Sequence, residues 1–164
     1  GRPGPCMSVP MTGRSPAAGD PFYARLVGCW RLVRWDSIGE DGSVEHPMGD
    51  PPEGLLAYTP DGTMVTNIGR AGRPAISAGD LLEGPADERN AAFGTFIAYA
   101  ARVALEGQTV IHDVVMSLYP NWVGSRQRRH AVLSDGDRTL VLTADPFPMR
   151  GRMSTQRLTW EKVG

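Results

Sequence analysis

Apolar and polar residues alternate along most of the chain after residue 28. The segments that alternate, or that are rich in Val, Ile, Thr, Leu and aromatic residues, are 29–36, 54–59, 63–68, 95–105, 109–119, 126–133, 139–143 and 154–162. A period of two is typical of half-buried β-strands. Links such as Pro60-Asp61-Gly62 suit antiparallel hairpins and are too short for parallel crossovers. The pattern therefore predicts an all-β domain of antiparallel strands, either closed into a barrel or stacked as a sandwich.

Two segments have a helical pattern instead. Asp20 and Pro21 supply an N-cap and a first-turn proline for a short helix that continues through Val27. Residues 81–93 predict a second short helix in the middle of the chain. This helix and the Gly/Arg-rich loop before it make residues 69–94 a candidate lid or plug over a pocket.

The start of the chain differs from the rest in composition. Residues 1–19 lack a periodic apolar pattern, so we expect a disordered tail whose first six residues are a remnant of expression. Residues 20–164 are then one domain, and a chain of 164 residues that is 41% hydrophobic is long enough to bury a core. Cys6 and Cys29 are too few for a disulfide framework, and we expect free thiols.

Charge and hydropathy exclude two classes of partner. The net charge is −1, and Arg126, Arg128 and Arg129 form the densest basic run, which is too narrow for a nucleic-acid interface. No stretch approaches the roughly 18–20 apolar residues of a membrane-spanning helix. The sequence does not begin with a signal peptide, so we expect a cytoplasmic protein without nucleic-acid or membrane partners.

A resemblance to a known family decides between barrel and sandwich. Gly28-Cys29-Trp30 is similar to the Gly-x-Trp opening of lipocalins, in which a short helix leads into the first strand and the Trp closes one end of the barrel. More specific is the order of the motifs that follow, which are GLLAYTPDG at 54–62, SAGDLL at 77–82, IAY at 97–99, His112 and PNWVG at 120–124. This succession resembles the bacterial and fungal lipocalin-like domain family over residues 22–162.

The resemblance implies a single up-and-down β-barrel that holds a small, largely apolar molecule. Some small barrels of this kind bind metabolites, and others, encoded with natural-product pathways, act as cofactor-free cyclases. The sequence departs from the family at Ala101 and Val103, where Gly and an aromatic residue are expected. We therefore expect a pocket of different shape at that level.

The hairpin predicted around residues 105–108 indicates which side chains face inward. Arg102 and Asp113 become diagonal neighbours that can form a surface ion pair, so their face should point outward. The predicted pairs are Val103 with Val110, Ala101 with His112, and Tyr99 with Val114. The inward face then carries Ile97, Tyr99, Ala101, Val103, His112, Val114 and Met116. A shift of one residue would exchange the two faces.

Three inward residues carry the candidate chemistry. His112 titrates near neutral pH and can exchange a proton with a ligand, or it can hold strands together as a hydrogen-bonded structural residue. Tyr99 can donate to a ligand carbonyl or serve as barrel core. Arg129 can bind a ligand carboxylate or enolate, or it can pair with Asp145 or Glu161 or pack over Trp30.

The remaining pocket residues are assigned by position. Asn121 and Trp122 lie in a predicted loop where they can line the mouth, or can cap the turn and cover the barrel end. Trp35 and Trp160 are assigned to barrel packing or partner contacts. The candidate substrate-binding residues are Trp122, Asn121, Met116, Val114, Ile97, Tyr58 and Met64.

Several classes of site have no signature in the sequence. His46, His112 and His130 are scattered singly, without a Cys/His cluster, so no metal site is expected. Dinucleotide-binding, Walker and nucleophile-elbow motifs are absent, and we expect no cofactor.

Two functions remain. The first is a cofactor-free cyclase or isomerase of a small hydrophobic natural-product intermediate, with His112, Tyr99 and Arg129 as catalytic residues. The alternative is a non-catalytic carrier for a small hydrophobic metabolite. An inward His beside an inward Tyr favours the enzyme slightly, and a homodimer is compatible with either function.

Overall fold

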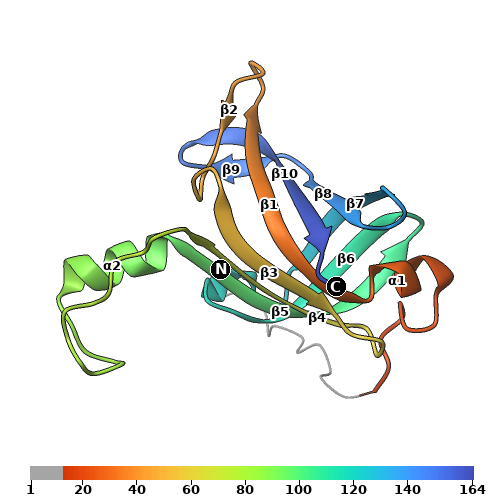
Figure 1. Cartoon of the computed structure of the whole chain (residues 1–164), viewed down its shortest axis with the longest axis horizontal. Helices are drawn as coiled ribbons and strands as arrows, with labels where there is room; N and C mark the ends of the chain where they lie inside the picture. The colour runs from red at the N-terminus through yellow and green to blue at the C-terminus, as the bar shows by residue number, and fades with distance from the viewer. Residues whose placement is uncertain (1–12) are drawn as a thin grey trace, which may run out of the picture.

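Eight antiparallel strands close into a barrel in the computed structural model, which describes residues 13–164 (Figure 1). They are β1 (Gly28–Gly39), β3 (Pro52–Tyr58), β4 (Thr63–Arg70), β5 (Phe96–Glu106), β6 (Thr109–Ser117), β7 (Arg126–Ser134), β8 (Thr139–Ala144) and β10 (Arg152–Lys162). Each strand pairs with its neighbour in that order, and pairing of β1 with β10 closes the ring. Two short strands, β2 (Val44–Glu45) and β9 (Phe147–Met149), pair with the extended ends of β1 and β10. The prediction of a closed antiparallel barrel is confirmed.

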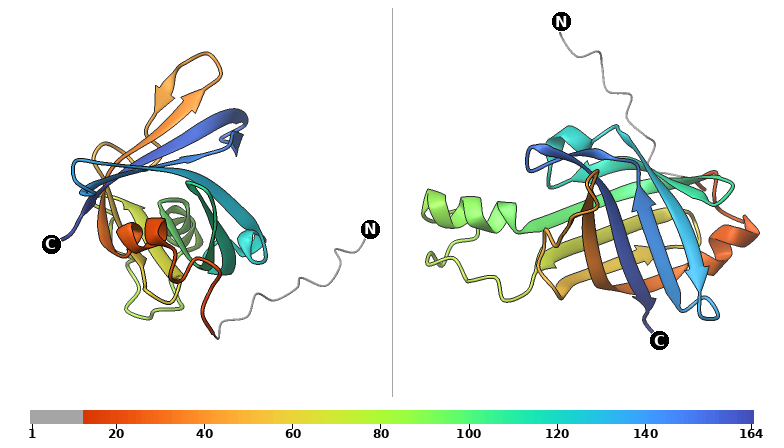
Figure 2. Two further views of the ribbon diagram at one scale, coloured as in Figure 1. Left: turned by 90° about the vertical axis from the view of Figure 1, so that its right-hand side faces the viewer. Right: turned by 90° about the horizontal axis from the view of Figure 1, so that it is seen from above.

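One end of the barrel is closed by α1 (Pro21–Leu26) (Figure 2). Trp30, at the start of β1, packs against this helix. Asp20 caps the helix, because its carboxylate accepts from the backbone N–H of Phe22 at 2.7 Å. Trp30 is fully buried, and its Nε1 donates to the carbonyl of Leu26 at 2.8 Å. The ammonium of Lys162 lies 4.8 Å from the centre of the indole ring. Lys162, and not Arg129, is therefore the basic residue that packs over Trp30.

Residues 13–19 pack against the outside of this end, so this part of the expected tail is ordered. The N–H of Ala17 donates to the carbonyl of Val103, and Ala17 is completely buried. Beneath this segment Arg102 donates to Thr63 Oγ1 and to the carbonyl of Gly13, and it lies 3.4 Å from Asp61. The expected Arg102–Asp113 surface pair is wrong, because the segment covers Arg102. Residues 1–12, including Cys6, lie outside the described part of the chain.

A second helix, α2 (Ala86–Gly94), projects from the opposite end of the barrel (Figures 1 and 2). It has no buried residue, and Leu81 and Leu82 in the preceding loop are 94% and 76% exposed. The helix is where the sequence predicted one, but it does not plug the barrel. Only its last residues, Phe93 and Gly94, reach the mouth. No helix within residues 13–164 has the length and apolar character needed to span a membrane.

The β5–β6 hairpin shows how register decides which side chains face inward. Glu106 pairs with Thr109, so the turn lies one residue later than predicted. The partners of Val103 and Ala101 shift by two residues, to His112 and Val114, and the partner of Tyr99 shifts by three, to Ser117. A shift of two preserves the faces, and His112 and Val114 point inward as predicted. The extra residue Val115 forms a bulge that reverses the alternation. Met116 therefore lies on the outer face, 66% exposed, and the prediction that it lines the pocket is wrong.

Candidate functional site

Two adjoining cavities occupy the barrel interior and its open end. The inner cavity has a volume of about 80 Å³, and the outer one, at the mouth, about 250 Å³. Trp35, Ile97, Trp122 and Met149 line both cavities. The inner wall also includes Leu56, Thr66, Ile68, Tyr99, His112, Arg129, Leu142, Phe147, Gln156, Leu158 and Trp160. Apolar and aromatic side chains with a few convergent polar groups are typical of a small-molecule site.

A chain of three polar side chains crosses the barrel beside the inner cavity. The Tyr58 hydroxyl lies 2.8 Å from Nε2 of His112, and the Tyr99 hydroxyl lies 3.0 Å from Nδ1 of the same ring. β3, β6 and β5 supply these residues, and rigid strands hold all three in place. Tyr99 lines the cavity and packs edge-on against Trp122, with ring centres 5.4 Å apart.

The protonation states of this chain follow from burial. His112 is 1% exposed, and burial together with the nearby charge of Arg129 lowers its pKa from 6.5 to about 3. Burial raises the pKa of both Tyr58 and Tyr99. The imidazole is therefore neutral and both hydroxyls are protonated throughout the physiological range.

The direction of hydrogen bonding follows from the partners available. Within residues 13–164 the buried Tyr58 hydroxyl has only Nε2 of His112 as a partner, so it must donate to that nitrogen. A neutral imidazole that accepts at Nε2 carries its proton on Nδ1 and donates to the oxygen of Tyr99. The hydrogen of Tyr99 then has no acceptor among the described residues. It is free to donate to a molecule in the cavity.

Arg129 supplies the positive charge of this site. Its guanidinium lowers the pKa of His112, and it opposes the effect of burial on the pKa of Tyr99 through charge and a hydrogen bond. The guanidinium also donates to the carbonyl of Arg128 at 2.8 Å and to Gln127 Oε1 at 3.4 Å. No acidic residue within residues 13–164 forms a salt bridge with it, so the expected partners Asp145 and Glu161 are not used. Glu161 pairs with Arg31 instead.

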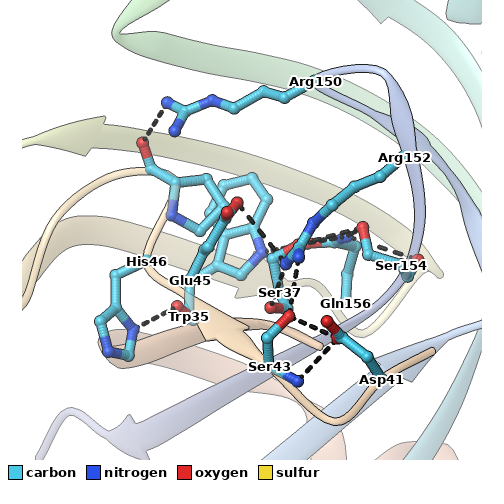
Figure 3. A network of polar contacts seen from close by, with 11 residues as sticks. Trp35, Ser37, Asp41, Ser43, Glu45, His46, Arg150, Arg152, Ser154 and Gln156 are labelled. Atoms are coloured by element: carbon cyan, nitrogen blue, oxygen red, sulfur yellow. Dashed lines mark hydrogen bonds and ion pairs between the residues drawn. The ribbon is translucent and has the colours of Figure 1, made fainter. Parts of the chain in front are cut away.

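A polar network fixes the part of the wall that β1 and β10 form (Figure 3). Nε1 of Trp35 donates to Gln156 Oε1 at 2.7 Å, and Gln156 Nε2 donates to the hydroxyls of Ser37 and Ser154. At the rim, Arg152 donates to Ser43. The network satisfies the amide of Gln156 in a buried position and holds the Trp35 indole between the two cavities.

The structure brings only some of the predicted site residues together. Tyr99, His112, Arg129, Ile97 and Trp122 line the inner cavity, and Tyr58 supports it through His112. Met64 and Val114 are buried inside the barrel but do not line either cavity, and Asn121 is exposed. Whether these side chains contact a ligand stays a prediction.

Sequence reasoning missed Trp35 and Trp160 as cavity residues. Trp30 and Leu32 point inward, so strict alternation would turn Trp35 outward. A bulge at Val33 reverses the alternation and turns Trp35 into the barrel. Trp160 pairs with Leu32 and therefore points to the same, inward face. This orientation follows from the pairing of β1 with β10, which the sequence pattern does not contain. Nε1 of Trp160 is buried and has no hydrogen-bond partner within the described residues.

The described residues contain no group of three or more His, Cys, Asp or Glu side chains arranged to hold a metal ion. Chemistry at this site rests on the hydroxyl of Tyr99, the guanidinium of Arg129 and the neutral imidazole behind them. These groups can donate hydrogen bonds to an oxygen and stabilise negative charge on it.

Comparisons with known proteins agree with this architecture. The model of the lipocalin-like domain family matches residues 27–163. The chain is also 33% identical over 108 residues to the 4'-hydroxy-3'-methoxypropiophenone carrier protein of Aspergillus oryzae. The matched region covers 61% of this chain and 96% of the relative. With most of its length matched by the family model, the chain belongs to the lipocalin-like domain family.

Proposed function

We propose that this barrel binds and carries a small, largely apolar aromatic metabolite without transforming it. The observation that carries the proposal is the pair of adjoining cavities, whose walls are mainly apolar and aromatic. The similarity to a carrier of a methoxylated phenyl ketone supports the same ligand class. A planar ring fits between the aromatic side chains, which bind such surfaces by stacking and edge contacts.

The state of His112 favours a carrier over a cyclase. Its two ring nitrogens are both engaged by tyrosine hydroxyls, and its pKa of about 3 makes it a weak base. A general base should have a pKa near the working pH and lie within reach of the proton that it removes. His112 acts on the ligand through Tyr99, and its role is to orient that hydroxyl.

Titration of the full chain with 4'-hydroxy-3'-methoxypropiophenone tests the proposal. Trp35, Trp122 and Trp160 line the inner cavity, so binding should quench tryptophan fluorescence and saturate at one molecule per chain. Chromatography after incubation should recover the compound unchanged. Absence of saturable binding would contradict a carrier of this class, and conversion to a new product would restore the enzyme hypothesis.

A matched pair of variants locates the binding. Ile97→Trp fills the junction between the cavities, so affinity should fall at least tenfold. Val132→Trp adds the same side chain to the outer face, where Val132 is 46% exposed, and should leave affinity unchanged. Equal affinities for the two variants would place the ligand outside the barrel.

A further inference from the structure

The inner cavity combines apolar walls with a cation that has no acidic partner. Among its lining residues Arg129 is the one with a formal charge at neutral pH, since His112 is neutral and no Asp or Glu lines the wall. Arg129 is half-buried and forms no salt bridge with any described residue. A partly desolvated cation without a counter-charge favours an anion beside it.

The charges around Arg129 on other elements do not neutralise it. On its own strand, Arg128 points outward to Glu106 at 2.8 Å. Across β8 its register partner is Ala144, and the exposed Asp145 that follows acts on Arg128. Across β6 its partner is the apolar Val110. Among the described residues, Tyr99 and His112 are the other titratable side chains that line the inner cavity, and Tyr58 adjoins it through His112.

Tyr99 adds a directed hydrogen-bond donor at the same point. Its oxygen accepts from His112, and it also interacts with the guanidinium of Arg129, so its own hydrogen points to neither. The Tyr99 hydroxyl and the Arg129 guanidinium, which has no acidic partner among the described residues, can together donate to one ligand oxygen. Both bonds strengthen when that oxygen is negatively charged.

We propose that Tyr99 and Arg129 bind the oxygen of an acidic hydroxyl on the ligand and hold it as the anion. This inference rests on the proposed function and names the ligand's chemical class, a phenol acidified by an acyl group on its ring. On binding, the O–H bond breaks, its electron pair stays on the oxygen, and the proton passes to solvent. The ring then lies among the indoles and the acyl chain extends toward Phe93 and Tyr119 at the mouth.

Two probes that differ by one methyl group test the inference. They are 4'-hydroxy-3'-methoxypropiophenone and its 4'-O-methyl ether, which cannot ionise. The phenol should bind at least about tenfold more tightly than the ether, as expected for hydrogen bonds to a charged group. Bound phenolate absorbance should show that the pKa of the probe falls by about one unit or more, since each unit is a tenfold preference for the anion. His112, Tyr58 and Tyr99 do not titrate between about pH 6 and 9, so the shift belongs to the probe.

Variants assign the effect to its residues. Arg129→Gln should abolish the pKa shift of the probe, Tyr99→Phe should reduce it, and Arg129→Lys should retain most of it because the charge remains. The neighbouring Arg128→Gln removes an outward guanidinium and should leave the shift unchanged. Circular dichroism confirms folding. If Arg129→Gln fails to fold, the comparison of Arg129→Lys with Tyr99→Phe decides the assignment.

The outcomes separate the two proposals. Equal, pH-independent binding of phenol and ether would overturn the anion site and leave the carrier intact. Failure of both probes to bind would overturn the carrier and the inference with it. A shift in the pKa of the phenol that survives Arg129→Gln would place the anion elsewhere and overturn the assignment.

Discussion

The two ends of the barrel use aromatic residues in opposite ways. At the closed end Trp30 and Tyr23 are at most 1% exposed, and the indole nitrogen of Trp30 and the hydroxyl of Tyr23 donate to backbone carbonyls. At the open end Phe93 and Tyr119 are 49% and 45% exposed, and Trp122 is half-buried between them and the cavity. At the closed end, burial of aromatic surface stabilises the fold. At the open end, aromatic surface stays exposed, where a small molecule can contact it.

The largest expected effect is that of Trp30→Ala on stability. The change removes a fully buried indole and its hydrogen bond to Leu26, and such truncations cost about 3–5 kcal/mol of unfolding free energy. Urea denaturation followed by circular dichroism measures the loss. Trp122→Ala, the same substitution at the open end, should lower the unfolding free energy by only about 1 kcal/mol. A similar loss for both variants would remove the distinction between the two ends.

The antiparallel strands were predictable because alternation with a period of two survives along most of each strand, whereas the choice of a closed barrel rested on the family resemblance. Between the turn and Ala101 the predicted hairpin register was shifted by two residues, and an even shift keeps His112 and Val114 on the inward face. For that reason the position of His112 beside Tyr99 inside the barrel could be predicted, although the residues paired across the two strands could not.

The parts that could not be predicted depend on single inserted residues and on distant segments. The bulge at Val33 turns Trp35 inward, and the bulge at Val115 turns Met116 outward. Neither bulge has a sequence signature such as Gly. The burial of Arg102 depends on residues 13–17, which lie far away in the sequence and have no periodic pattern. Alternation describes a strand and contains no information about what covers it.

A second test uses pH, because the middle of the barrel carries the neutral His112. Its pKa falls from 6.5 to about 3 on folding, so the unfolded chain binds a proton that the native chain does not. Stability should therefore be fully present above about pH 6.5 and fall on acidification by about 1.4 kcal/mol per pH unit. Denaturation between about pH 6.5 and 5.5 avoids most carboxylate titration, because this window lies above the usual pKa values of Asp and Glu, which are about 4.

The His112→Gln variant isolates this contribution. Its unfolding free energy should be nearly independent of pH in the same window, whereas His130→Gln, which removes an exposed imidazole, should keep the wild-type slope. A wild-type slope in His112→Gln would assign the acid sensitivity to other groups.

At the open end, Trp122→Ala should weaken binding more than it weakens the fold. Trp122 lines both cavities and contacts the edge of Tyr99, so its loss should lower affinity for the hydroxylated ketone about tenfold, or ~1.4 kcal/mol. Fluorescence titration measures this through Trp35 and Trp160. Tyr119→Phe keeps the ring against Trp122 and serves as the control, with affinity unchanged. An unaltered Kd for Trp122→Ala would mean that the ligand lies deeper than this ring.

The smallest expected effect compares one type of hydrogen bond at both ends. Asp20 accepts from the N–H of Phe22 at 2.7 Å, and Asp80 accepts from the N–H of Leu82 at 2.8 Å. The bond of Asp20 begins α1, the helix that buries Leu26 against Trp30, so Asp20→Ala should lower the unfolding free energy by about 1 kcal/mol.

Asp80→Ala removes the same type of bond from an exposed loop, where the next two residues are themselves exposed. Its effect should stay within about 0.5 kcal/mol, because no packed element depends on that turn. Parallel urea titrations of both variants give the comparison with no ligand involved. Equal losses of unfolding free energy would show that the hydrogen bond itself accounts for the whole effect. The packing of α1 at the closed end would then add nothing to the contribution of Asp20.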